Sequence, residues 1–240
     1  MYSLDEFLKV DMHVHSSGVS FCSQRTCEEI IEHKIALGYD GIVLTNHCQS
    51  HYYPPEMHAD YMERVIEEFE RGLAYAKKKN FRFYLGIEVS LFDPFYSDWL
   101  LYGVTPEILR RSPCLYQLNQ KSLFEFCQEN DVLLVQAHPY RANRSYCPDM
   151  HPGEPKFLHG LEINCTPGDL EDEERIIAFC REQRKIVTCG TDYHNVDRDY
   201  FGGTCLPAWV ETSADIAKYL KETENTHIFL GERVIEIPTK

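Results

Sequence analysis

Short apolar segments alternate with amphipathic segments along most of the chain. We expect strands over the apolar segments, which span residues 9–15, 40–47, 82–91, 98–104, 132–138, 161–165 and 185–189. Longer segments between them, including 57–79 and 170–184, space their apolar residues as helices do. Strands that alternate with helices are typical of a parallel α/β sheet, and six or seven such units are enough to close a barrel.

Capping residues mark where the first helix begins and ends. Thr26 suits the N-cap, Glu29 stands at the capping-box position, and Gly38 follows the last apolar residue of the segment. No low-complexity stretch interrupts the chain. We therefore expect residues 1–240 to form a single domain, with the strand-end motifs confined to about 9–205.

Polar residues that can bind metal ions recur at or near the ends of the expected strands. They are His13, His15, His47, Glu88, His138, Asp192 and His194. Residues two apart in a strand face the same side, so His13 and His15 can bind one ion, and Asp192 and His194 have the same spacing. In a barrel the carboxyl ends of the strands meet at one edge, where active sites form. Imidazole and carboxylate ligands suit zinc, manganese or iron.

Each of these residues taken singly also has an ordinary structural explanation. His13 and His15 can be unrelated surface residues, Glu88 a solvated strand end, and His138 a buried histidine with satisfied hydrogen bonds. The recurrence of ligand-type residues along one edge of the expected barrel favours a metal site over these alternatives.

Five short motifs carry these residues, in the order Asp11-Met-His13-Val-His15-Ser16, Gly41-Ile-Val-Leu-Thr-Asn-His47, Gly86-Ile-Glu88, Ala137-His138-Pro139 and Gly190-Thr-Asp192-Tyr-His194. Together they resemble the PHP superfamily (polymerase and histidinol phosphatase). The resemblance implies a distorted (β/α)7 barrel, a centre of two or three divalent ions (zinc, manganese or iron), and phosphoesterase activity. It implies one ion bound by His13, His15, Glu88 and Asp192, a second by Glu88 and His138, and a third by His47 and His194.

The chain departs from the family pattern at the third ion. Many members carry an Asp or His a few residues after the His-x-His pair, whereas residues 16–22 read Ser-Ser-Gly-Val-Ser-Phe-Cys. Cys22 can replace the missing ligand because a thiolate binds zinc and iron well, and His51 is a second candidate. The alternative for Cys22 is a buried thiol with no ligand role.

The expected catalyst is a metal-bridged hydroxide held by Glu88. Arg141 and Arg144 follow the His138 motif, and their planar guanidinium groups match phosphate oxygens, although either can be an ordinary surface residue. Further polar residues beside the motifs are expected to orient the ligands or, in the 161–165 strand, to contact substrate; they are Asp11, Asn46, Glu162 and Asn164.

The composition narrows the class of partner. The 240 residues include 24 Lys and Arg and 38 Asp and Glu, which gives a formal net charge of −14. We therefore expect a small phosphorylated substrate and neither a membrane nor long nucleic acid, since both attract basic proteins. The N-terminus shows no secretory signal, no apolar stretch is long enough to span a bilayer, and the 10 Cys form no Cys-x-x-Cys pair. These features predict a cytoplasmic protein with mostly reduced cysteines.

Three functions are compatible with these features. The leading prediction is hydrolysis of a small phosphate monoester, similar in chemistry to histidinol phosphatase. The second is a phosphodiesterase or exonuclease acting on nucleotides or oligonucleotide ends, because the superfamily also accompanies polymerases. The third is a catalytically silent metal-binding regulatory domain, which the near-complete ligand set disfavours.

Overall fold

The computed structural model describes residues 7–93, 95–141, 150–195 and 200–239. The described strands form one sheet in the order β11-β10-β9-β1-β2-β4-β5-β6-β7-β8, with β3 paired to β4. Their bounds are β1 (Leu8–Val14), β2 (Gly41–Leu44), β3 (His47–Cys48), β4 (Arg82–Leu91), β5 (Ser97–Tyr102), β6 (Leu133–Gln136), β7 (Gly160–Asn164), β8 (Ile186–Gly190), β9 (Gly202–Leu206), β10 (Asn225–Leu230) and β11 (Arg233–Pro238).

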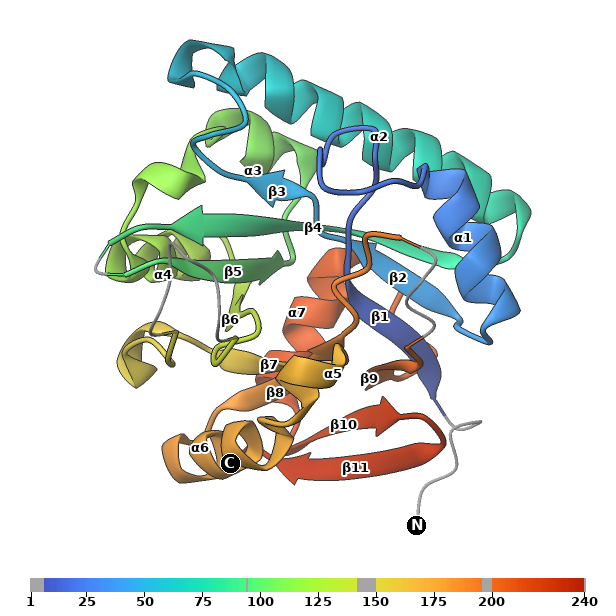
Figure 1. Cartoon of the computed structure of the whole chain (residues 1–240), viewed down its shortest axis with the longest axis vertical. Helices are drawn as coiled ribbons and strands as arrows, with labels where there is room; N and C mark the ends of the chain where they lie inside the picture. Colours follow the sequence, from blue (N-terminus) through green and yellow to red (C-terminus); the bar gives the residue numbers. More distant parts are fainter. Residues whose placement is uncertain (1–6, 94, 142–149, 196–199, 240) are drawn as a thin grey trace.

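Seven of these strands make a nearly closed barrel (Figure 1), which confirms the expected fold class. β1, β2, β4, β5, β6, β7 and β8 are neighbours in that order. The ring closes where the chain leaving β8 returns to β1, because Val14 pairs in parallel with Tyr193. Backbone hydrogen bonds from Tyr193 N–H to the His13 carbonyl (3.1 Å) and from His15 N–H to the Tyr193 carbonyl (3.0 Å) hold this seam. β9, β10 and β11 extend the sheet from β1, and each pairs antiparallel with the strand before it in the sheet.

β5 is the reversed strand of the barrel. It runs antiparallel to both β4 and β6, whereas β1–β2, β2–β4, β6–β7 and β7–β8 are parallel pairs. Only five residues, 92–96, separate β4 from β5, and a parallel crossover needs about a dozen or more. The expected all-parallel sheet is therefore wrong at this strand, and β5 begins at the edge where its neighbours end.

The helices are α1 (Cys27–Ala36), α2 (His58–Lys78), α3 (Pro106–Arg111), α4 (Gln120–Glu129), α5 (Pro167–Leu170), α6 (Glu173–Gln183) and α7 (Ser213–Glu222). The expected capping box is present at α1: Thr26 accepts from the Glu29 N–H, and the Glu29 carboxylate accepts from the Thr26 N–H. The helix expected over 57–79 is α2, whose buried face includes Tyr61, Val65 and Ile66. The helix expected over 170–184 is α6, which begins three residues later, and the separate short helix α5 ends at Leu170.

The sequence also predicts that no segment spans a membrane and that the cysteines are mostly reduced. No helix in the described part of the chain is long and apolar enough to cross a membrane. The nine cysteines among the described residues are all free thiols.

Candidate metal centre

β1 brings the first two predicted ligands to the middle of the barrel. His13 and His15 are fully buried, and their Nε2 atoms lie 3.0 Å apart. β1 pairs with β2 on one side, and its end pairs with the segment after β8 on the other. The two rings therefore face the same side, as their spacing predicts.

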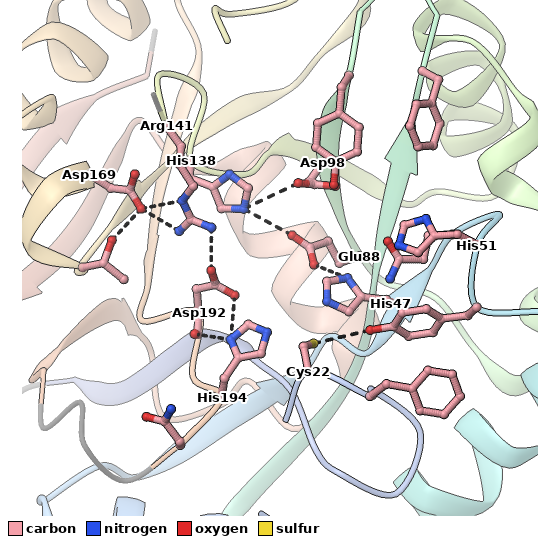
Figure 2. A pocket seen from close by; sticks show the side chains of 17 residues that line it. Cys22, His47, His51, Glu88, Asp98, His138, Arg141, Asp169, Asp192 and His194 are labelled. Carbon is pink, nitrogen blue, oxygen red and sulfur yellow. Dashed lines mark hydrogen bonds and ion pairs between the residues drawn. The ribbon is translucent and has the colours of Figure 1, made fainter. Parts of the chain in front are cut away.

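Glu88, in β4, lies among four of the predicted histidines. Figure 2 shows it beside two of them, His47 and His138. Its Oε1 is 3.2 Å from His13 Nε2 and 3.4 Å from His138 Nε2. Its Oε2 is 2.7 Å from His47 Nδ1 and 3.4 Å from His15 Nε2. One carboxylate oxygen thus lies beside His13, expected at the first ion, and His138, expected at the second, and the other oxygen lies beside His47 and His15.

Asp192 and His194 approach the same cluster from the segment after β8. Asp192 Oδ1 is 3.4 Å from His13 Nε2 and 3.2 Å from His15 Nε2. Asp192 and His138 have positive φ angles of 50° and 29°, which are uncommon for residues other than glycine. Such backbone strain gathers at functional sites, where the surrounding structure holds it. All seven residues predicted from the strand ends therefore lie in one site.

Sequence analysis missed Asp98, which is 3% exposed and belongs to the same site. Its Oδ2 lies 3.9 Å from His138 Nε2, and its carboxylate groups with Glu88 and His138 closely enough to share an ion. The search for ligands at the carboxyl ends of strands could not find it, because Asp98 stands at the beginning of the reversed β5. The short gap between the two expected strands, residues 92–97, was the signal that predicts this reversal.

The donor atoms of the site suit a metal ion. Four sets of three residues in the described part of the chain place their ligand atoms within 4.8 Å of one another. These sets are His13–His15–Glu88, Glu88–Asp98–His138, His15–His47–His194 and His13–His138–Glu162. Their imidazole nitrogens and carboxylate oxygens are the ligands preferred by zinc, manganese and iron.

Several buried atoms of the site have no hydrogen bond within the described structure. They are the Nδ1 atoms of His15, His47 and His138 and the Oε2 atom of Glu88. His47 Nδ1 and Glu88 Oε2 are close, at 2.7 Å, but without hydrogen-bond geometry. Buried polar atoms are nearly always paired. Glu88 Oε2 and His47 Nδ1 face each other at the centre, where a bound ion can complete them, whereas His15 and His138 turn their Nε2 atoms toward Glu88.

Nearby positive charges keep the carboxylates ionised. Burial by itself raises the pKa of Glu88, but the charges of His13 and His47 hold that pKa well below its ordinary value. Burial likewise opposes ionisation of Asp192, whereas Arg141 and His13 hold the pKa of Asp192 well below its ordinary value. Both groups are therefore carboxylates at neutral pH, which is the form that binds a cation.

Glu162, in β7, hydrogen-bonds two of the predicted ligands, and Asn164, in the same strand, hydrogen-bonds Glu162; neither residue lines the cavity. Glu162 Oε1 is 2.9 Å from His13 Nδ1, and Glu162 Oε2 accepts from the His138 N–H (3.1 Å) and from Asn164 Nδ2 (3.2 Å). When Glu162 accepts the Nδ1 proton of His13, the Nε2 lone pair of that ring faces the centre. Of the two roles weighed for this strand, orientation of ligands is the one seen.

Asn46 and Asp11 orient backbone beside the ligands, as expected. Asn46 Oδ1 accepts from the Ser16 N–H at 2.9 Å, just after the His-x-His pair. Asp11 Oδ1 accepts from the His13 N–H at 3.2 Å and from the Thr191 N–H at 2.9 Å. Asp11 therefore ties the His-x-His strand to the segment that carries Asp192.

Cys22 lies beside the His47 and His194 side of the centre. Its thiol Sγ is 3.4 Å from the Tyr52 hydroxyl. Partial removal of the Cys22 thiol from water raises its pKa, but the neighbouring His194 and His47 favour the thiolate and lower the pKa to about 6. The thiolate form that binds metals is therefore accessible at neutral pH. His51, the other candidate, lines the same cavity, and neither Cys22 nor His51 belongs to any of the four ligand sets.

Arg141 is at the site and already contacts two carboxylates. Its Nη1 donates to Asp192 Oδ2 at 2.7 Å, and its Nε and Nη2 contact Asp169 Oδ2 at 2.7 Å and 2.5 Å. A guanidinium group has five N–H donors, so these three contacts leave two. Arg144 lies outside the described residues.

The centre opens into a cavity of about 990 Å³. Figure 2 shows His47, His138, Asp192 and His194 converging on it, with Arg141 and Asp169 on one side and Cys22 on the other. The other lining residues are Phe21, Gln49, His51, Tyr52, Glu88, Phe92, Tyr96, Asp98, Thr166 and Asn195. A cavity of this size is at the upper end of those that bind small molecules.

Solved structures of low sequence identity share this fold. A two-domain protein from Bacteroides vulgatus, with a domain assigned as a PHP-like metal-dependent phosphoesterase, is 20% identical with a TM-score of 0.66, over 96% of this chain and 67% of that chain. A protein from Bifidobacterium adolescentis assigned as a metal-dependent phosphoesterase is 13% identical with a TM-score of 0.57, over 88% of this chain and 94% of that chain.

Endonuclease Q in complex with a 27-mer duplex substrate is 14% identical with a TM-score of 0.55, over 88% of this chain and 56% of that chain. This chain thus spans just over half the length of that endonuclease. No family profile matches the chain, and no curated protein is similar to it in sequence. The resemblance to the PHP superfamily is confirmed for the fold.

The expectation that long nucleic acid is not a partner is wrong. Endonuclease Q has the same fold, and its structure holds duplex substrate with an abasic lesion at the active site. The expectation rested on the net charge of −14. The field at a site is set by the nearest groups and bound ions rather than by the total charge. Net charge therefore does not exclude nucleic acid for this fold.

Proposed function

We propose that this protein is a metal-dependent phosphoester hydrolase that acts on a phosphate monoester. The observation that carries the proposal is the cluster of buried imidazole and carboxylate groups whose donor atoms gather in sets of three beneath the large cavity. The fold shared with proteins assigned as metal-dependent phosphoesterases supports it. The proposed ligands are His13, His15, His47, Glu88, His138, Asp192 and His194, with Asp98 added and Cys22 at the third position.

The residues would hold two or three divalent ions in the sets that the geometry favours. Such ions, when bound, lower the pKa of water and withdraw charge from phosphoryl oxygens. Glu88 lies between the sets, so it is the group proposed to hold neighbouring ions together. Glu162 keeps His13 oriented toward the centre through the 2.9 Å contact with Nδ1.

Arg141 is proposed to bind the phosphate. Its contacts with Asp192 and Asp169 fix the guanidinium plane at the wall of the cavity. Its two remaining N–H donors can reach phosphoryl oxygens, and a planar fork suits that geometry. The same contacts give Arg141 a second role, because they orient Asp192 toward His13 and His15.

A second candidate is hydrolysis of a phosphodiester in a nucleic acid. The similarity in fold to endonuclease Q favours it. The third possibility, a silent metal-binding domain, is disfavoured because a complete donor set opens into a cavity large enough for a substrate.

Release of phosphate tests the proposal. The purified chain is loaded with manganese, zinc or iron and supplied with small monoesters or with an oligonucleotide. We expect phosphate release from monoesters. His13→Ala is expected to lower bound metal and reduce turnover at least a hundredfold while circular dichroism stays unchanged, because Glu88 and Asp192 lose a common partner.

His151→Ala is the matched control, since His151 is exposed and outside the cavity lining. Wild-type turnover in His13→Ala would contradict the ligand assignment. Cleavage of the oligonucleotide without release from monoesters would favour the second candidate. A metal-loaded protein that hydrolyses neither would overturn both.

A further inference from the structure

Two phenylalanine side chains are left exposed at the cavity. Phe21 and Phe92 are 63% and 53% exposed, and both line it. Only three other large hydrophobic side chains of the described chain are exposed, and none of them lines the cavity. Apolar surface in contact with water is unfavourable by about 25 cal/mol per Å², so its concentration beside a binding cavity indicates a ligand surface.

The ring of Phe21 is connected to the metal centre through a row of aromatic contacts. The Phe21 ring centroid lies 4.7 Å from that of Tyr52, and the Tyr52 centroid lies 5.7 Å from that of His47. Tyr52 in turn packs edge-on against the buried Tyr61, with centroids 6.1 Å apart. Tyr52 is thus fixed from behind, and Phe21 extends the row from a metal-ligand candidate to solvent.

The charges of the lining restrict what can bind beside these rings. Among the described lining residues, the only Lys or Arg is Arg141, which is paired with Asp169 and Asp192. The remaining groups outside the ligand sets are neutral amides, aromatic rings, Thr166, His51 and Cys22, a thiol that carries either no charge or a negative one. No further guanidinium or ammonium group is available there for a second anion. The lining near Phe21 therefore suits a flat, uncharged group.

We infer that Phe21 and Tyr52 form a stacking surface for an uncharged aromatic ring in the leaving group of the phosphoester. This inference rests on the proposed function and adds the class of substrate. The phosphoryl group would lie at the metal centre, and the ring would stack on Phe21 on the path from His47 to solvent. An aromatic leaving group can stack in an offset arrangement on these rings, which strengthens its binding. An alkyl leaving group of similar length cannot make this contact.

The test compares benzyl phosphate with propyl phosphate, because their leaving alcohols are similar in acidity. Hydrolysis of either consumes one water, breaks the P–O bond and yields the alcohol and inorganic phosphate. We expect the metal-loaded protein to prefer benzyl phosphate by about tenfold in kcat/KM. Phe21→Ala should remove that preference, chiefly by raising KM for benzyl phosphate. The kcat/KM for propyl phosphate should stay unchanged, because a propyl group does not stack on Phe21.

Phe21→Tyr, which keeps a ring, should retain the preference. Trp209→Ala removes an exposed ring outside the cavity lining and should change kcat/KM for neither substrate. Bound metal, measured in each variant, should stay constant. Inhibition by benzylphosphonate and propylphosphonate gives a binding readout without turnover, and Phe21→Ala should weaken only the first.

The outcomes separate the two proposals. Equal use of the two monoesters by the wild-type protein, or an unchanged preference in Phe21→Ala, would overturn the stacking surface while the hydrolase stands. Failure to hydrolyse either monoester would overturn the proposed function itself.

Discussion

Two buried polar clusters lie next to each other in this protein and differ in how they are satisfied. In the metal-ligand cluster, His15, His47, His138 and Glu88 keep buried atoms without hydrogen bonds in the described structure. In the second, centred on Lys34 of α1, the donors and acceptors have partners. The two are joined at His13, whose N–H donates to Asp11.

Lys34 is fully buried, and polar and aromatic groups around its ammonium group offset the cost of burying the charge. Its Nζ lies 2.5 Å from Asp11 Oδ2 and 3.1 Å from Thr191 Oγ1. It also lies over the rings of Tyr39 and Tyr193, 4.6 Å and 4.7 Å from their centroids. Cation–π contacts and charge-assisted hydrogen bonds offset the cost of removing the charge from water.

The difference separates supporting residues from binding residues. In the Lys34 cluster, which supports the fold, the buried polar groups are paired. The groups proposed to bind ions keep unpaired atoms, at a cost in folding free energy. The predictions below test this distinction.

The largest effect is expected at the supporting cluster. Lys34→Met leaves the Asp11 carboxylate buried without its cation, which should lower the free energy of unfolding by about 3–5 kcal/mol in urea denaturation. Asp11→Asn combined with Lys34→Met should recover part of the loss. A loss below about 1 kcal/mol in the single variant would show that Lys34 is not needed to balance that charge.

A smaller effect of opposite sign is expected at the metal-ligand cluster. A divalent ion at 100 times its dissociation constant should raise the free energy of unfolding by about 2.7 kcal/mol, because it binds only the folded chain. Thermal melts with and without a chelator measure this increment. Glu88→Gln should reduce it strongly, since Glu88 contacts four histidines of the cluster. An equal increment in that variant would contradict the central position of Glu88.

The smallest effect is expected at His159, a histidine that is paired but not charged. Its Nδ1 accepts from the Leu134 N–H at 2.9 Å. Burial, with the charges of Lys221 and Lys185, lowers the pKa of His159 from 6.5 to about 4. Between these values the unfolded chain binds more protons, so this contribution to stability is present above pH 6.5 and is lost as pH falls toward 4.

His159→Gln removes the titrating group and should flatten this part of the pH dependence by about 1.4 kcal/mol for each pH unit between these values, relative to the wild-type chain. Urea denaturation at several pH values between these limits measures the difference. Parallel curves for the two proteins would contradict the assignment.

Local features of the sequence predicted the elements that carry the ligands. The two-residue spacing of His13 and His15 is read directly from strand geometry, and the Thr26–Glu29 capping box marks the start of α1. Glu88 and Asp192 were found because they follow apolar strands. These features depend on neighbours within a few residues, so no knowledge of the tertiary structure was needed.

Other parts of the site depend on residues far apart in the chain. Glu162 contacts His13 across 149 residues, and Arg141 contacts Asp192 across 51. A pattern search sees a lone carboxylate or a lone arginine in each case. The direction of β5, which places Asp98 beside His138, depends on which strands it pairs with.

The sequence by itself determined a barrel of alternating strands and helices and the identities of the residues at its strand ends, because periodicity and capping are local. The tertiary structure decided which polar residues are paired and which are left open. Lys34 reads in the sequence as an ordinary helix residue, yet it is fully buried beneath the site. Whether a buried charge supports the fold or awaits a ligand depends on partners that only folding brings into contact.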